Sequence, residues 1–114
     1  MLPRSHRLLA TRDFQRAYRR GRSAHSRTLR LRTLAHGRPV TRFGIVVSNR
    51  IAKRAVVRNR LKRRLRESVR PLLPRILPGF DVILSAQPGA DAASLVQLRQ
   101  DLQAVLVRAR LIRP

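Results

Sequence analysis

The acidic and histidine side chains, which carry out most acid–base and metal chemistry, are few and scattered in this sequence. No two carboxylates have the spacing of an acid–base pair, and no Gly-rich phosphate loop, His-Glu-x-x-His helix or nucleophile elbow is present. A nuclease that uses two metal ions would need several clustered carboxylates. The sequence therefore predicts no catalytic residue and no metal site in the protein itself. The residues concerned are Asp13, Glu67, Asp81, Asp91 and Asp101, with His6, His25 and His36.

Cationic side chains, in contrast, dominate the composition. The 114 residues include 27 Lys or Arg against 5 Asp or Glu, for a net charge of +22. Charge of this size opposes compaction, so we expect a polyanionic partner, either nucleic acid or an anionic membrane. Only Lys53 and Lys62 are lysines. Guanidinium groups pair with phosphate and stack on bases, which suits RNA, although a GC-rich genome would also favour Arg.

The positive charge is unevenly distributed along the chain. Residues 1–75 hold 23 basic and 2 acidic side chains, whereas residues 76–114 hold 4 and 3. We therefore predict that the first two-thirds carry the partner surface and that the last third is scaffold. The chain has no cysteine, which excludes disulfides and thiolate metal sites.

The longest basic segment runs from Ile51 to Pro71. At 100° per residue, its apolar positions fall on one arc of about 120°. The opposite side gathers amide and cationic groups, so we predict an amphipathic helix that Pro71 and Pro74 end. Such a helix can span several phosphates. A merely solvated face would mix Glu with Arg at i, i+4 spacing, but only Glu67 is available. The apolar arc is Val57, Leu61, Leu65, Ser68 and Val69; the opposite side is Asn59, Lys62, Arg63, Arg66 and Arg70.

Other patterns predict the elements that surround this helix. A short helix over about 12–20 is indicated by Thr11 as N-cap and by a stop at Gly21. A strand at 27–35 alternates apolar residues with Arg30 and Arg32, and a second strand spans 43–47. The short connection between them predicts an antiparallel hairpin. A strand at 80–85 and a charge-poor helix over about 95–109 complete an α+β arrangement.

The segment from Arg42 to Glu67 reads as a strand that ends at Ser48, a VSKK-like turn, and a helix that carries Arg58-Asn59-Arg60. This combination resembles the signature of the bacterial ribonuclease P protein family. An Arg-Leu-x4-Asp-Phe-x3-Tyr pattern from Arg7 to Tyr18 and a Gly-Phe-Asp-Val-Ile strand extend the resemblance over nearly the whole chain.

The resemblance implies an α+β fold in which three helices pack on a sheet of about four strands. It also implies a left-handed βαβ crossover of the ribosomal protein S5 domain 2-like type, which general rules do not predict. We expect one domain over residues 1–114, with flexible ends at 1–10 and 111–114. The family function is the cytoplasmic maturation of tRNA 5′ ends. The resemblance implies that a catalytic RNA performs the chemistry with magnesium ions that it mainly holds, and that one protein copy per RNA assists it.

Site residues follow from the same resemblance, position by position. Phe14, Tyr18, Arg30 and Arg32 match the cleft that holds the 5′ leader of precursor tRNA, with Arg32 where some members have an aromatic residue. Asn49 replaces a usual Lys of the turn. Positions that match the surface facing the catalytic RNA are Ser48, Arg50, Lys53, Arg54, Arg58, Asn59, Arg60, Lys62, Arg63 and Arg66.

Three alternatives explain the charge without this family. A structural RNA-binding protein, such as a ribosomal protein, shares the charge and size but needs no aromatic cleft. A cationic membrane-binding peptide would expose the bulky apolar residues that this chain needs for its core. The first 26 residues also have the Arg-rich, acid-poor composition of an organelle transit peptide. No stretch approaches the ~20 apolar residues of a membrane span, so we expect no membrane partner.

Overall fold

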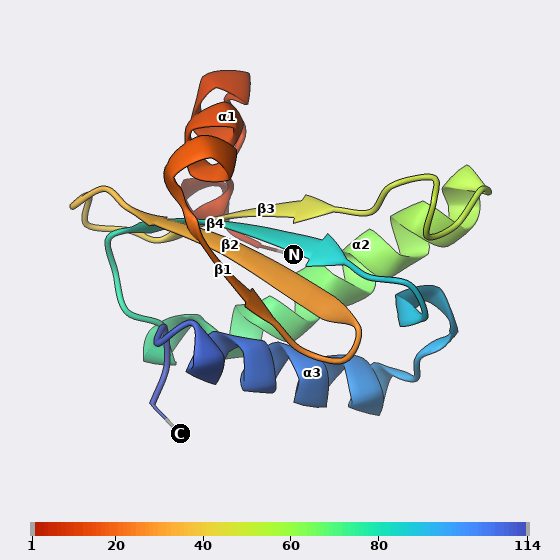
Figure 1. The fold of residues 1–114 in the computed structure, drawn as a ribbon. Helices are drawn as coiled ribbons and strands as arrows, with labels where there is room; N and C mark the ends of the chain where they lie inside the picture. Colours follow the sequence, from red (N-terminus) through yellow and green to blue (C-terminus); the bar gives the residue numbers. More distant parts are fainter. Residues whose placement is uncertain (1, 114) are drawn as a thin grey trace.

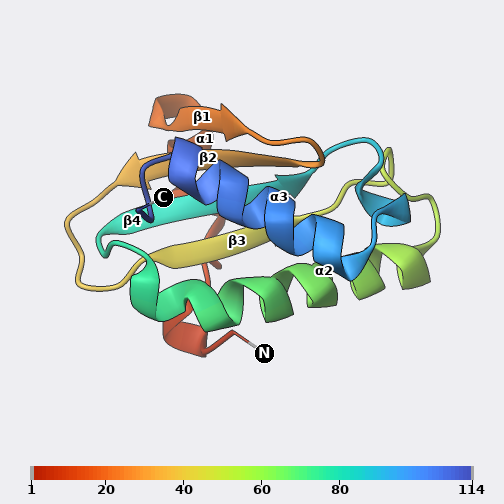
Figure 2. The same ribbon diagram turned by 90° about the horizontal axis from the view of Figure 1, so that it is seen from below.

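A computed structural model describes residues 2–113 as three layers built around one sheet. Helix α1 (Thr11–Arg20) lies on one face of the sheet, and α2 (Ala55–Val69) and α3 (Leu95–Arg108) cover the other (Figures 1 and 2). The strands are β1 (Arg22–His25), β2 (Leu29–Ala35), β3 (Arg42–Val46) and β4 (Phe80–Ala86). Short 3-10 turns complete the chain: η1 (Arg4–His6), η2 (Arg70–Arg75) and η3 (Ala90–Ala92). The predicted α+β class is confirmed.

The order of strands in the sheet is β1-β2-β4-β3. The predicted hairpin between 27–35 and 43–47 is therefore wrong: β4 lies between β2 and β3, antiparallel to the first and parallel to the second. The β3–α2–β4 segment is a parallel crossover unit, whose left-handed sense stays a prediction. Strand β1 was not predicted, because Arg22–His25 has no apolar alternation and is defined by its pairing with β2.

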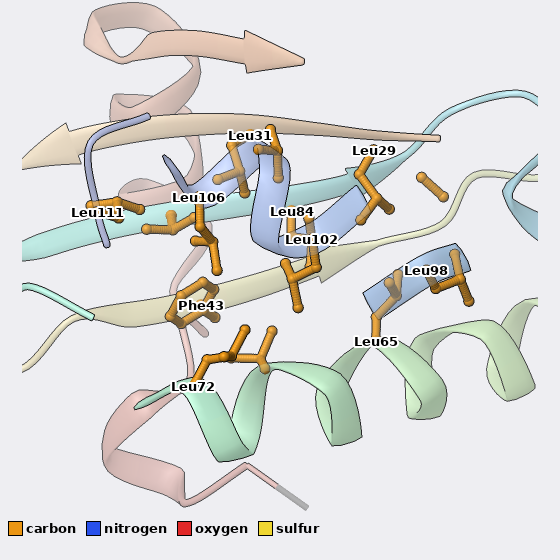
Figure 3. Close-up of a cluster of buried hydrophobic side chains, with 14 of the residues drawn as sticks. Leu29, Leu31, Phe43, Leu65, Leu72, Leu84, Leu98, Leu102, Leu106 and Leu111 are labelled. Atoms are coloured by element: carbon orange, nitrogen blue, oxygen red, sulfur yellow. The ribbon is translucent and has the colours of Figure 1, made fainter. Parts of the chain in front are cut away.

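The main core lies between the sheet and the helices α2 and α3 (Figure 3). The alternation predicted for β2 is confirmed, since Leu29 and Leu31 are fully buried on this side while Arg30 points to the other face. Strand β4 is buried on both faces, as a central strand should be. Figure 3 shows how α2, α3 and the strands contribute to one cluster, which includes Leu65, Leu84, Leu98, Leu102 and Leu106.

A smaller core cluster fixes α1 on the opposite face of the sheet. Leu8, Ala17 and Ile83 are buried there, and Phe14 packs against them. Helix α1 begins one residue earlier than predicted: Ala10 is the N-cap, and Thr11, the predicted cap, is the first helical residue. Gly21 ends the helix as predicted. A Cβ at this position would lie 2.4 Å from the Ala17 carbonyl oxygen, so only glycine fits the close approach.

The segments at both ends of the chain contribute side chains to the core. Leu2, Leu8, Leu111 and Ile112 are buried. The backbone amide of Leu8 donates to the Phe43 carbonyl (2.8 Å), so this segment covers the outer edge of β3. The flexibility expected for 1–10 and 111–114 stays a prediction, and its outermost positions, 1 and 114, lie outside the described residues.

Candidate RNA-binding surfaces

A basic groove runs between α2 and the segment that precedes α1. It encloses about 530 Å³ and is lined by Arg7, Leu9, Asn59, Lys62, Arg63, Arg66 and Glu67. The amphipathic pattern predicted for α2 explains why the groove lies on this side of the helix. Leu61, Leu65 and Val69 are buried against the sheet, so the residues between them face outward. Four of the residues predicted to face RNA thus lie in one groove.

The turn that leads into α2 adds further predicted residues at the N-terminal end of that helix. Ser48, Arg50, Lys53 and Arg54 are all exposed. The side chain of Arg58, in contrast, is bound within the protein. Its Nη1 donates to the carbonyl oxygens of Ala52 (3.0 Å) and Lys53 (2.7 Å). The guanidinium of Arg58 therefore fastens the turn to the first turn of α2.

The sheet face beside α1 brings together the residues predicted to hold the leader. Phe14 is half-buried and packs on Gly44, where an added Cβ would lie 2.3 Å from the ring. Tyr18, one turn further along α1, is 47% exposed. Arg30 and Arg32 emerge from β2 on this same face, and both donate to the Ser23 hydroxyl. The face therefore presents one exposed aromatic ring beside two guanidinium groups.

Arg32 also binds the end of α1. Its Nε donates to the Ala17 carbonyl (3.3 Å) and its Nη2 donates to the Tyr18 carbonyl. These are carbonyls of the last helical turn, where a positive charge is favourable. Arg32 thus fixes the position of α1 relative to β2, in addition to any contact that it makes with RNA.

A buried ionic cluster fixes the start of α1. Arg42 forms two hydrogen bonds with Asp81 and lies 3.4 Å from the Asp13 carboxylate. These hydrogen bonds raise the pKa of Arg42 above its ordinary value. His36 contributes a fourth side chain: its Nδ1 accepts from the Arg38 amide, and its Nε2 lies 3.1 Å from Asp81. A proton on Nε2 is the tautomer that suits both contacts.

The other buried carboxylate is also occupied by protein groups. Asp101 accepts hydrogen bonds from the Thr28 hydroxyl and from the side chain of Gln97. Within residues 2–113, no three His, Asp or Glu side chains gather as metal ligands would. In the same part of the chain, no helix has both the length and the apolar character needed to cross a membrane.

The family model for ribonuclease P matches residues 2–110. The chain belongs to the ribonuclease P protein family. The ribonuclease P protein component of Microcystis aeruginosa is 40% identical over 115 residues, which cover 97% of this chain and 96% of that protein. The component from Synechococcus elongatus is 42% identical over 116 residues, with coverages of 97% and 95%.

Solved ribonuclease P proteins share the fold. The Staphylococcus aureus protein superposes with a TM-score of 0.86 at 30% identity, covering 95% of this chain and 98% of that one. The Thermotoga maritima protein gives 0.81 at 28% identity, with coverages of 90% and 96%. Three helices on a four-stranded sheet, as the resemblance implied, are confirmed for this member of the ribonuclease P protein family.

Three residues that line the α2 groove were not predicted as site residues from the sequence of this ribonuclease P family member: Arg7, Leu9 and Glu67. Arg7 and Leu9 line it from the segment before α1. Arg7 also donates from Nε to the Leu2 carbonyl (2.9 Å), which holds its side chain. Arg7 was recognised only as part of the Arg7–Tyr18 motif, in which Leu9 is an unspecified position. Nothing in its spacing indicates that it meets a helix 50 residues later.

Proposed function

We propose that this chain is the protein subunit of a ribonuclease P ribonucleoprotein. It binds the catalytic RNA through the α2 groove and the preceding turn, and it holds the 5′ leader of precursor tRNA on the sheet face beside α1. One protein copy acts with one RNA in the cytoplasm. The RNA then cleaves off the leader to leave the mature tRNA 5′ end.

The observation that carries the proposal is the placement of two different surfaces on opposite faces of one sheet. The α2 groove combines cations with the Asn59 amide on a rigid helix, which suits the phosphates and sugars of folded RNA. The α1 face combines the exposed Tyr18 ring with guanidinium groups, which suits single-stranded RNA of any sequence. A protein built this way can hold two RNA segments at once.

We assign the chemical step to the RNA subunit because the three buried carboxylates of the protein are bound by protein groups, and no three His, Asp or Glu side chains gather within residues 2–113. Asp13 and Asp81 share Arg42, and Asp101 is bound by Thr28 and Gln97. These side chains do not fit a protein-held magnesium site, which needs free carboxylate oxygens. Magnesium ions are therefore proposed to be held mainly by the RNA, and no step is assigned to a protein-bound metal.

The contribution of the protein is then positional and electrostatic. The leader carries no complementary strand, so its bases are free to stack on Tyr18 and on guanidinium planes. The net charge of +22 offsets phosphate repulsion between the catalytic RNA and its substrate. We expect this effect to be largest when magnesium is scarce.

The test is cleavage of a precursor tRNA at low magnesium by the protein alone, by the cognate catalytic RNA alone, and by both. We expect efficient release of the leader only from the mixture, and none from the protein alone. An arginine-rich peptide of equal total charge serves as control for nonspecific screening. Cleavage by RNA-free protein, or equal rescue by the peptide, would contradict the proposal.

A further inference from the structure

A second groove lies at the end of α3, and it shares no lining residue with the α2 groove. It encloses about 740 Å³ and is lined by three apolar and three cationic residues: Leu77, Val107 and Ile112 with Arg75, Arg110 and Arg113. No acidic residue lines it. Within residues 2–113, the three guanidinium groups make no ion pair or side-chain hydrogen bond. The groove thus offers an apolar surface beside three uncommitted cations.

The walls of this groove are tied together by backbone hydrogen bonds. The Leu77 amide donates to the Leu111 carbonyl (2.9 Å), which joins the segment after η2 to the segment after α3. The Leu111 amide donates back to Leu106 (3.0 Å), so the chain turns sharply as it leaves the helix. Ile112 is buried and Leu77 is 52% exposed. The groove is therefore preformed, with a fixed floor and an open apolar side.

The backbone conformation of Arg110 indicates that its side chain is needed there. Arg110 has φ = 61°, and no other non-glycine residue among those described has a positive φ. It follows the C-cap Ala109, at the position where helices favour Gly or Asn. An Arg in this conformation costs free energy that a Gly would not. Local stability does not explain the Arg, so an external contact is the better explanation.

Arg110 also lines a neighbouring hollow of about 260 Å³, together with Arg22 and Arg108. Arg108 donates to the His25 carbonyl and so holds β1 against the end of α3. The two hollows join through Arg110 into one cationic band. The chain segments that form it come from β1, η2 and the C-terminal end, which are far apart in sequence.

We propose that this groove binds an unpaired segment of the catalytic RNA. The inference rests on the proposed function and adds a contact to it. Guanidinium groups of Arg75, Arg110 and Arg113 would hold phosphates, while a base packs on the exposed side chain of Leu77. The groove is formed by the ends of α3 and η2 and by the segments that follow them, and α3 lies on the sheet face opposite α1 (Figure 1). That placement assigns it to the catalytic RNA rather than to the leader.

The test exploits the unusual backbone of Arg110. Arg110→Gly removes the cation and relieves the backbone, so we expect an unchanged or higher melting temperature together with weaker binding of the catalytic RNA. We expect an affinity loss of about three- to tenfold and a salt slope smaller by about 0.7–1. Arg110→Asn should give the same melting temperature and RNA affinity as Arg110→Gly, because Asn also tolerates a positive φ. It does not make the unfolded backbone more flexible, as Gly does. Binding of a leader oligonucleotide should not change.

Two further variants make each outcome decisive. Arg99→Ala removes an equal charge from an exposed site on α3 outside both hollows, and Lys62→Ala alters the α2 groove. If Arg99→Ala weakened binding as much as Arg110→Gly, a general charge effect would replace this proposal. If Lys62→Ala weakened binding and Arg110→Gly did not, the groove proposal would be overturned while the proposed function stood. If neither variant weakened binding, both the groove proposal and the proposed function would be overturned.

Discussion

Arg42 and Asp81 are directly paired residues of the parallel strands β3 and β4, and their side chains form a bidentate ion pair. Nε lies 2.8 Å from Oδ1, and Nη2 lies 2.8 Å from Oδ2. The third nitrogen of the same guanidinium reaches Asp13 at the start of α1. One cation therefore links the two strands to the helix that carries Phe14 and Tyr18. The integrity of the proposed leader surface depends on this link.

Arg42→Leu should destabilise the fold strongly, because it leaves the buried carboxylates of Asp13 and Asp81 without a cation. Removing one partner of a buried pair typically costs about 3–5 kcal/mol in the free energy of unfolding. Urea denaturation followed by circular dichroism measures this change. Arg38→Leu, at an exposed site near β3, is the matched control and should cost little. Equal stability of the two variants would show that the ionic cluster does not hold α1.

Gly44→Ala should displace Phe14 from the sheet. The added Cβ would lie 2.3 Å from the Phe14 Cζ atom, and the ring must move. Overpacking of this kind costs about 1–3 kcal/mol. The double variant Gly44→Ala with Phe14→Leu should recover part of the loss, because the smaller side chain leaves room. Thermal unfolding of the three variants tests this, and an additive loss in the double variant would argue against the contact.

Lys62→Ala and Arg63→Ala should weaken assembly with the catalytic RNA. Both residues line the α2 groove, and each lost phosphate contact should reduce the slope of log affinity against log salt by about 0.7–1. Filter binding over a range of salt concentrations measures both quantities. Unchanged affinity and slope in both variants would show that the α2 groove is not the RNA surface.

Arg58→Ala should act mainly through stability. Its guanidinium donates to two backbone carbonyls of the turn before α2, so its loss leaves these groups without their partner. We expect a decrease of about 1–2 kcal/mol in the free energy of unfolding. Lys62→Ala, which removes equal charge from the same helix, should leave stability nearly unchanged. A stable Arg58→Ala variant with weak RNA binding would instead indicate direct contact with RNA.

Tyr18→Ala should weaken binding of precursor tRNA to the assembled ribonucleoprotein and leave mature tRNA nearly unaffected. Only the precursor has a leader, and a stacked base contributes about 1–3 kcal/mol. Tyr18→Phe retains the ring and should bind like the unchanged protein. Circular dichroism must show that each variant is folded. Equal weakening of both tRNAs would support a packing role for Tyr18 in place of a leader contact.

Local patterns in the sequence determined the elements that a single segment can specify. The apolar arc of α2 and the alternation of β2 predicted which side chains are buried, because helical and strand periodicity place residues on one face regardless of what covers it. The density of cations on α2 likewise predicted an outward basic surface. These predictions needed no knowledge of distant residues.

Only the tertiary structure decided which segments meet. β2 and β3 run in opposite directions as expected, but β4 separates them, since pairing a central apolar strand on both sides buries more surface than a hairpin at the edge. Asp13, Arg42 and Asp81 are scattered in sequence and joined in space. The last third of the chain was predicted to be scaffold, yet it places Arg110 and Arg113 beside Arg75. Such contacts depend on the sheet order and on chain closure over long separations, which local periodicity does not encode.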